Sequence, residues 1–334
     1  MSSLNPMTRK KERIDALAES TAGPSRGGGQ VAEAGKVAGG EGTSLLASAW
    51  KRLRRNPAFW IGAVLTGLVV LLAIFAPWLA PHDPAARVLI DKVSSANNPV
   101  PGPEPGSPLG ADGSPFGRDL LSRLIWGSRQ TLQIGFLATI GGFIGGLILG
   151  TLAGAFGGWI DSAIMRVVDV MLSIPSILLA TAIATLYGRA SNNTLIVAIA
   201  IVQIPIFARL LRGSMLAQRH SDHVLAARAL GVKQRAIVLR HMLPNSLAPI
   251  LVQATLVLAT SIIDAAGLTF IGLGAVTDDS PEWGQMLGSR QTQSLFDTFP
   301  HLAFWPAACI IVTALGFTLL GESLREALDP KSRR

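Results

Sequence analysis

The feature that most constrains this sequence is a run without any charged side chain, which occupies residues 130–160. As a helix that rises about 1.5 Å per residue, such a run is long enough to cross roughly 30 Å of hydrocarbon. Charged residues make up only 15% of the chain and apolar residues 49%, whereas a soluble domain averages roughly 25% charged residues. The sequence therefore predicts an all-α polytopic membrane protein.

Six segments have the apolarity of membrane spans. Lys51, Arg52, Arg54 and Arg55 precede the first span and place the N-terminus in the cytoplasm by the positive-inside rule. Six spans return the C-terminus to the cytoplasm, and the basic stretch at 209–241 then also lies inside. The expected spans are residues 59–80, 130–160, 169–188, 194–208, 247–270 and 302–321.

Composition divides the rest of the chain. Residues 1–45 lack the apolar content that offsets ordering entropy, so a disordered cytoplasmic N-terminal tail is expected there. A proline-rich extracytoplasmic loop is expected between the first two spans. The other expected segments are a basic stretch with the first span at 46–80, the extracytoplasmic loop at 81–128, a membrane core at 129–322 with a cytoplasmic loop at 209–245, and a cytoplasmic tail at 323–334.

Composition also argues against several functions. The single cysteine, Cys309, excludes a disulfide within the chain and a cysteine-based zinc site. No carboxylate or thiol triad joins His220 and His223, so no metal site is expected. The net charge of +8 is accounted for by basic residues at the cytoplasmic face, so nucleic-acid binding is not expected. No G-x-x-x-x-G-K-[ST] motif occurs, which argues against P-loop hydrolysis of ATP.

The sharpest motif lies in the predicted cytoplasmic loop. Ser221 or Asp222 can cap a short helix, and Gly231 can end it in the left-handed conformation. A second short amphipathic stretch at 234–242 leads to Pro244, which opens the fifth span. Taken alone, this pattern also fits a solvated connector. Residues suited to docking a partner are the small Ala226 and Ala227 and the basic Arg228, Lys233 and Arg235.

This loop resembles the cytoplasmic loop of ABC importer permease subunits, which has Glu-Ala-Ala, then Gly, then a Leu-Pro pair. Here Ala226-Ala227, Gly231 and Leu243-Pro244 stand at that spacing, and Leu225 takes the place of the usual glutamate. The resemblance to the C-type permease of dipeptide and oligopeptide importers covers about residues 50–330. The other segments that carry it are 108–110, 117–123, 157–161, 166–169, 249–255, 268–274, 283–287 and 306–307.

The resemblance implies the type I ABC importer transmembrane fold, with 129–322 as the permease core and both termini cytoplasmic, in the bacterial inner (cytoplasmic) membrane. It implies a subunit of an ATP-driven importer. Di- or oligopeptides are the first expected substrates, and glutathione, nickel chelates and sugar-related ligands are the others. The chain would be no enzyme and bind no cofactor, because two partner ATPase subunits bind ATP and Mg. The other implied partners are a second homologous permease, an extracytoplasmic substrate-binding protein and membrane lipid. The implied ATPase-coupling residues are Leu225, Ala226, Ala227, Arg228, Gly231 and Pro244.

Two further features have alternative interpretations. The tripeptide Gly117-Arg118-Asp119 either caps a helix and locks the outer loop or contacts the binding protein. Five glycines spaced four apart allow close helix packing, either within this chain or against the second permease. These glycines are Gly142, Gly146, Gly150, Gly154 and Gly158.

Asp264, within the fifth span, is the third such feature, because a carboxylate there is costly unless it faces a cavity or a partner. It is assigned with Gly272 and Gly274 to the translocation path or gate, with a buried hydrogen-bonded role as the alternative. Asp169 shares a helical face with Arg166, so the two are expected to pair. A rival function is an ion-gradient-driven secondary transporter with Asp264 and Asp169 as coupling carboxylates. A membrane-embedded enzyme would need a catalytic pair or metal cluster, which the sequence lacks.

Overall fold

The computed structural model describes residues 50–94, 96–113, 115–274 and 279–328, which include α-helices but no β-strand. The predicted disordered tail at 1–45 and the last residues of the predicted C-terminal tail lie outside this part of the chain. Within it, five helices are long and apolar enough to cross a membrane. They are α3 (Pro57–Leu79), α4 (Leu120–Phe156), α7 (Asn192–Gln218), α10 (Leu243–Phe270) and α13 (His301–Leu328).

The segment predicted as a third straight span is bent. In its place α5 (Gly158–Ser173) and α6 (Ser176–Leu186) meet at an angle of 100°. Pro175 lies at the bend, where a proline disfavours helical geometry in the preceding residue and lacks the N–H that the helix needs. The span predicted at 169–188 is therefore not one helix; if this bent pair is counted as one span, the described residues contain six candidate spans.

Several predicted boundaries also move; α13, for example, continues to Leu328, inside the tail predicted at 323–334. Helix α4 begins at Leu120, inside the loop predicted at 81–128, because the Asp119 carboxylate caps its first turn. Helix α7 continues to Gln218, inside the loop predicted at 209–245, and two of its arginines there pair with carboxylates of α5.

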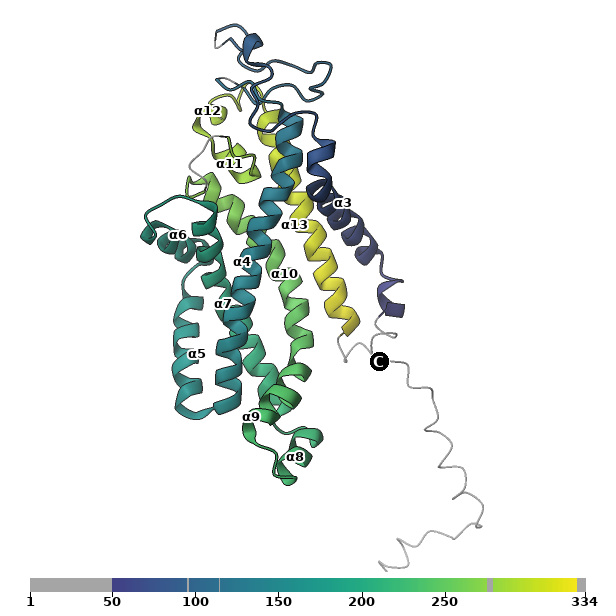
Figure 1. The fold of residues 1–334 in the computed structure, drawn as a ribbon, viewed down its shortest axis with the longest axis vertical. Helices are drawn as coiled ribbons and strands as arrows, with labels where there is room; N and C mark the ends of the chain where they lie inside the picture. Colours follow the sequence, from purple (N-terminus) through teal and green to yellow (C-terminus); the bar gives the residue numbers. More distant parts are fainter. Residues whose placement is uncertain (1–49, 95, 114, 275–278, 329–334) are drawn as a thin grey trace, which may run out of the picture. The chain divides into compact units, whose positions relative to one another are not determined.

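The short elements gather at the two ends of the helical bundle (Figure 1). Helices α8 and α9 lie at one end, named here the α8 end, while α11, α12 and the loop before α4 lie at the opposite end, the α11 end. Helix α3 begins and α13 ends on the side of the α8 end, where Asn56 Nδ2 donates to Glu326 at 3.3 Å. The short elements are η1 (Ile90–Lys92), α8 (Asp222–Ala229), α9 (Gln234–Ile237), the π-helical η2 (Val238–Met242), α11 (Trp283–Gly288) and α12 (Arg290–Gln293).

Helices α4 and α7 are in close contact along the row of glycines. A Cβ built at Gly146 would lie 2.3 Å from Phe207 Cβ, and one at Gly150 would lie 2.8 Å from the carbonyl oxygen of Ala208. Gly142 and Gly154 contact α7 in the same way, whereas Gly158 has a φ of +60° and begins α5 with open space around it. Four of the five glycines therefore pack within this chain, and the alternative of packing against a second permease is wrong for them.

A methyl group at Gly146 would force the α7 backbone away from α4. Gly146→Ala should therefore destabilise the protein by about 1–3 kcal/mol, the usual cost of overpacking a tight contact. The measurement is the thermal unfolding midpoint of the detergent-purified protein. Gly67→Ala in α3 is the matched control, because nothing lies within 4 Å of a Cβ built there. Equal midpoints for the two variants would contradict the close contact.

Candidate functional site

Helix α8 ends at a glycine with the geometry that the sequence predicts. Gly231 has a φ of +73°, which favours glycine because it lacks a Cβ. Its N–H donates to the carbonyl of Arg228 at 2.9 Å, and the N–H of Val232 donates to that of Ala227 at 3.1 Å. These two bonds form a Schellman motif, which satisfies carbonyl groups at the helix end. The chain thus turns sharply from α8 into α9.

One face of α8 is fixed to the bundle. Val224 and Ala227 are buried in a cluster with Leu211 and Met215 of α7 and Ile237 of α9. Since buried side chains pack as densely as an organic crystal, a shift of α8 must move these neighbours. The sequence analysis proposed that a partner docks against Ala227. The geometry does not favour this, because the Ala227 side chain is only 6% exposed and packs against its own chain.

The opposite face of α8 is open and partly apolar. Leu225 is 47% exposed and Leu230 83% exposed, and Ala226 and Arg228 are exposed beside them. Pro244 is exposed at the start of α10, in the adjoining element. Large apolar side chains on an exposed short helix are typical of a surface that another protein covers.

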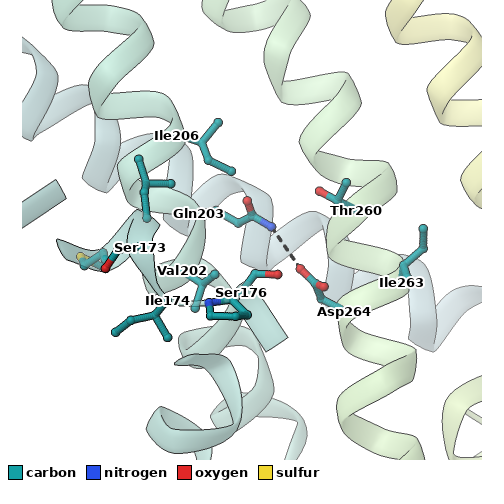
Figure 2. Close-up of a pocket in the computed structure, with 12 residues that line it drawn as sticks. Ser173, Ile174, Ser176, Val202, Gln203, Ile206, Thr260, Ile263 and Asp264 are labelled. Atoms are coloured by element: carbon teal, nitrogen blue, oxygen red, sulfur yellow. Dashed lines mark hydrogen bonds between the residues drawn. The ribbon is translucent and has the colours of Figure 1, made fainter. Parts of the chain in front are cut away.

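Two hollows lie along the bundle between α7 and α10. The first has a volume of about 560 Å³ and is lined by the bend between α5 and α6 together with residues of α7 and α10 (Figure 2). The second, of about 650 Å³, shares Leu172 and Ile206 with the first and extends past Arg209 to Ser214 and Pro249. Together they form a groove, which we call the α7–α10 groove, that begins at Asp264 and continues toward the α8 end.

Asp264 lies in this groove, but the two glycines assigned with it do not. Gly272 and Gly274 follow the end of α10, about two helical turns beyond Asp264. Gly272 has a φ of +88°, and its N–H donates to the carbonyl of Thr269 at 2.9 Å, so it ends the helix as Gly231 does. The structure therefore brings only Asp264 of these three residues to the groove.

Two ion pairs connect α5 to α7. Arg212 contacts both carboxylate oxygens of Asp161, with Nη2 to Oδ2 at 2.7 Å, and Arg209 Nη2 contacts Asp169 Oδ1 at 2.6 Å. Asp169 therefore pairs across helices, and the expected pair with Arg166 is wrong. Sequence reasoning assigned both arginines to a loop; their spacing of three residues, which puts them on one helical face, was the signal for a longer α7.

Arg219 closes the end of α4 in a related way. Its Nη2 donates to the carbonyl of Ala155 at 2.9 Å, in the last turn of α4. A cation there satisfies an unpaired carbonyl and interacts favourably with the helix dipole. Three arginines of the basic segment thus have structural partners, and the sequence alone counted them as one charged stretch.

A second polar network orders the α11 end. Asp119 accepts from the backbone N–H of Ser122 at 2.8 Å and caps α4, while Gly117 has a φ of +62°. Arg118 is 2% exposed, and it donates to Asp112 at 2.7 Å and to Asp279 at 3.1 Å. The tripeptide thus ties the loop before α4 to the segment before α11.

Glu282 is a buried carboxyl of the α11 end that the sequence analysis did not single out. It is 1% exposed, caps α11 by accepting from the N–H of Gln285 at 2.8 Å, and accepts from the hydroxyl of Thr131 at 3.2 Å. Burial raises the pKa of this carboxyl, and the hydrogen bonds lower it by less. No sequence signal identifies this contact, because its α4 partner lies 151 residues away.

Two family models of transport permeases match this chain. Residues 146–334 match the family described as binding-protein-dependent transport system inner membrane component. Residues 44–99 match the N-terminal transmembrane domain of oligopeptide transport permease C. The chain belongs to these permeases. It is therefore a multi-pass inner membrane protein of the ABC importer permease family, as the resemblance implies.

Curated relatives of this permease match over most of its length. A dipeptide transport system permease protein of Alkalihalophilus pseudofirmus is 43% identical over 85% of this chain and 90% of its own length. A di/tripeptide transport system permease protein of Pseudomonas aeruginosa is 39% identical over 86% and 93%. A glutathione transport system permease protein of Pectobacterium atrosepticum is 38% identical over 84% and 90%.

A solved structure confirms the predicted fold class. The methionine ABC transporter MetNI, in an inward-facing conformation, matches 63% of this permease and 98% of its own chain, with a TM-score of 0.50 and 21% identity. At this identity the match concerns the fold alone. The prediction of a type I ABC importer transmembrane fold with about six helices is thereby confirmed.

The buried carboxyl of Glu282 makes stability depend on pH. Because its pKa is raised in the folded state, the folded protein holds a proton that the unfolded chain releases above the ordinary value of 4.5. Stability therefore falls as pH rises through the window between the ordinary and the raised pKa. Glu282→Gln keeps an oxygen for the Gln285 N–H and removes the ionisation, so its thermal midpoint should rise relative to the wild type across that window.

The control for this measurement is Asp297→Asn, which changes an exposed carboxyl in the same segment. The thermal midpoints of all three purified proteins are followed from pH 4.5 to 8. Parallel curves for the wild type and Glu282→Gln would contradict the role of Glu282.

Proposed function

We propose that this chain forms the translocation path of an ATP-driven importer for di- or oligopeptides, together with a second homologous permease. The family membership and the two dipeptide-type relatives support peptides as the first substrate class, with glutathione next. The observation that carries the proposal is the combination of a groove along the bundle with an open-faced helix at one end of it. Such a groove suits one wall of a passage.

Coupling to ATP rests on α8 in this proposal. Two ATPase subunits bind ATP and Mg, one of them docks on the open face of α8, and the two move together when they bind ATP. Because Val224 packs against Leu211 and Met215, the movement of α8 passes to α7 and opens the path outward. A substrate-binding protein delivers the substrate at the α11 end, and hydrolysis restores the inward state. The permease itself performs no chemistry on the substrate.

Leu225, which stands where related permeases usually have glutamate, fits this proposal. At this position the chain presents an exposed apolar side chain, as it does at Leu230 and Ala226. An ATPase that binds this face would bury apolar area instead of forming a salt bridge, at about 25 cal/mol per Å² of area removed from water. Arg228 supplies the charge for orientation.

The rival secondary transporter lacks support from the contacts. Asp169, one of its two coupling carboxylates, forms an ion pair with Arg209 at 2.6 Å and so has a structural partner. The relatives are named as permease proteins of transport systems, in line with a multi-subunit importer.

Variants of α8 test the docking proposal. Leu225→Asp and Leu230→Asp should each reduce co-purification of the two ATPases from the co-expressed complex, by about tenfold or more, because a carboxylate would replace an apolar contact in the interface core. The measurement is the amount of ATPase retained per permease, together with ATP hydrolysis stimulated by the loaded binding protein.

Val88→Asp is the matched control, because Val88 is an exposed apolar residue of the loop between α3 and α4. It should retain both ATPases. Normal ATPase retention in both leucine variants would refute docking on α8, and uptake by the chain alone with an ion gradient would favour the rival.

Orientation in the membrane is tested separately. We propose that the α8 end is cytoplasmic, since residues 219–242 carry arginine and lysine while 279–300 carry only Arg290 as a basic residue. In a Cys309→Ser background, an impermeant maleimide should label Asn97→Cys from outside intact spheroplasts and Lys233→Cys only after the membrane is opened. The reverse pattern would invert the topology.

A further inference from the structure

The α7–α10 groove contains one charged side chain among its lining residues near the bend, Asp264 of α10. Figure 2 shows its carboxylate directed from α10 toward Gln203 of α7, beside Ser176 and below Thr260. Apolar side chains such as Ile174, Val202 and Ile206 make up most of the rest of the lining, together with the hydroxyls of Ser173, Ser176 and Thr260. The carboxylate is therefore a single negative charge in a largely apolar cavity of about 560 Å³.

No cation of the described chain neutralises Asp264. Its hydrogen bond is a long one, from Gln203 Nε2 to Asp264 Oδ2 at 3.5 Å, and none of the ion pairs among the described residues includes it. The arginines farther along α7, Arg209 and Arg212, already contact Asp169 and Asp161. A carboxylate within a membrane span is costly without a positive partner, and the described residues supply none.

Gln203 is held beside Asp264 by polar contacts within the bundle. It is 2% exposed, and its Nε2 lies 3.5 Å from both Ser261 Oγ and Asp264 Oδ2. The Ser261 hydroxyl in turn contacts the Thr139 hydroxyl of α4 at 3.1 Å. Gln203 Oε1 is buried and has no hydrogen-bond partner among the described residues. A buried amide oxygen without a donor costs free energy, which a donor from a ligand would recover.

These groups favour one chemical class of ligand. A hard divalent cation requires about six oxygen ligands, and the described residues hold no cluster of three His, Cys, Asp or Glu that suits a metal. A carboxylate and an amide oxygen instead suit a primary ammonium group, which has three N–H donors and one positive charge. The apolar lining suits the organic part that follows the ammonium.

We propose that Asp264, positioned by Gln203, receives the N-terminal ammonium group of a peptide as the peptide moves along the α7–α10 groove. This inference rests on the proposed function and adds a recognition element within the permease itself. The Asp264 carboxylate and the Gln203 amide oxygen both accept from the ammonium, while Gln203 Nε2 positions the carboxylate. A peptide whose N-terminus is acetylated carries no charge to pair there, so it loses this interaction.

The test uses the complete complex in proteoliposomes, with uptake of dileucine delivered by the binding protein and ATP hydrolysis measured in parallel. Asp264→Asn should lower uptake by about tenfold or more, the loss expected when one partner of a buried charge pair is removed. Its binding-protein-stimulated ATP hydrolysis should stay within about twofold of the wild type, since asparagine has nearly the same shape and the docking face of α8 is unchanged. Asp264→Glu keeps the charge and should retain most of the uptake.

Thr260→Val is the matched control, because Thr260 lines the same hollow one turn away on α10 and carries no charge. It should transport dileucine as the wild type does. Undiminished uptake by Asp264→Asn, with normal ATP hydrolysis, would overturn the ammonium site and leave the proposed function intact. A wild-type complex without ATP-dependent uptake would instead refute the proposed function.

If the complex with Asp264→Asn does not assemble, a second measurement tests the ammonium site in a complex that keeps Asp264. In a complex with Cys309→Ser and Thr260→Cys, leucine amide, which has an ammonium but no carboxylate, should slow maleimide labelling of residue 260. N-acetyl-leucine amide has the same apolar part without the charge and should not slow it. Equal labelling rates with the two probes would overturn the inference.

Discussion

The close contact between α4 and α7 is the constraint on which the rest of the structure depends. Glycines one turn apart bring the α7 backbone against α4, so that Phe207 and Leu211 lie where larger α4 side chains would otherwise stand. In a membrane, where lipid tails compete equally for apolar surface, such close packing is itself the source of helix association. The ion pairs of Arg209 and Arg212 then hold α5 to α7, which makes α4, α5 and α7 one unit.

Sequence reasoning was accurate where a local rule decides the structure. Apolar segments identified five long helices, and the glycine after α8 has the positive φ that its position predicted. Pro175 was a visible signal for the break between α5 and α6. The sequence analysis nevertheless predicted one span at 169–188, because the whole segment is apolar. Spacing along one helix also suggested that Asp169 pairs with Arg166, whereas it pairs with Arg209 of another helix. A sequence reveals neighbours on one helix more readily than neighbours on two different helices.

The rest required the tertiary structure. The four-residue glycine spacing reveals a face for packing but does not identify the partner helix, which lies more than fifty residues away. Glu282 looks like any exposed acid in the sequence, and only the approach of α11 to Thr131 buries it. For Asp264 the sequence identified the cost of the carboxylate, while its place in a hollow beside Gln203 came from the packing of α7 against α10. The coupling residues of α8 and the role of Asp264 stay predictions.

Helix α7 connects both proposed sites, and its geometry suggests how they communicate. Gln203 lies at the groove and Met215 in the cluster beneath α8, twelve residues along one helix and thus about 18 Å apart. We expect a push on α8 to displace α7 relative to α10, which carries Asp264 on the opposite wall of the groove. The separation of Gln203 from Asp264 would then change with the state of the ATPases. A long 3.5 Å contact tolerates such a change more readily than a short ion pair would, because little free energy is lost when it opens.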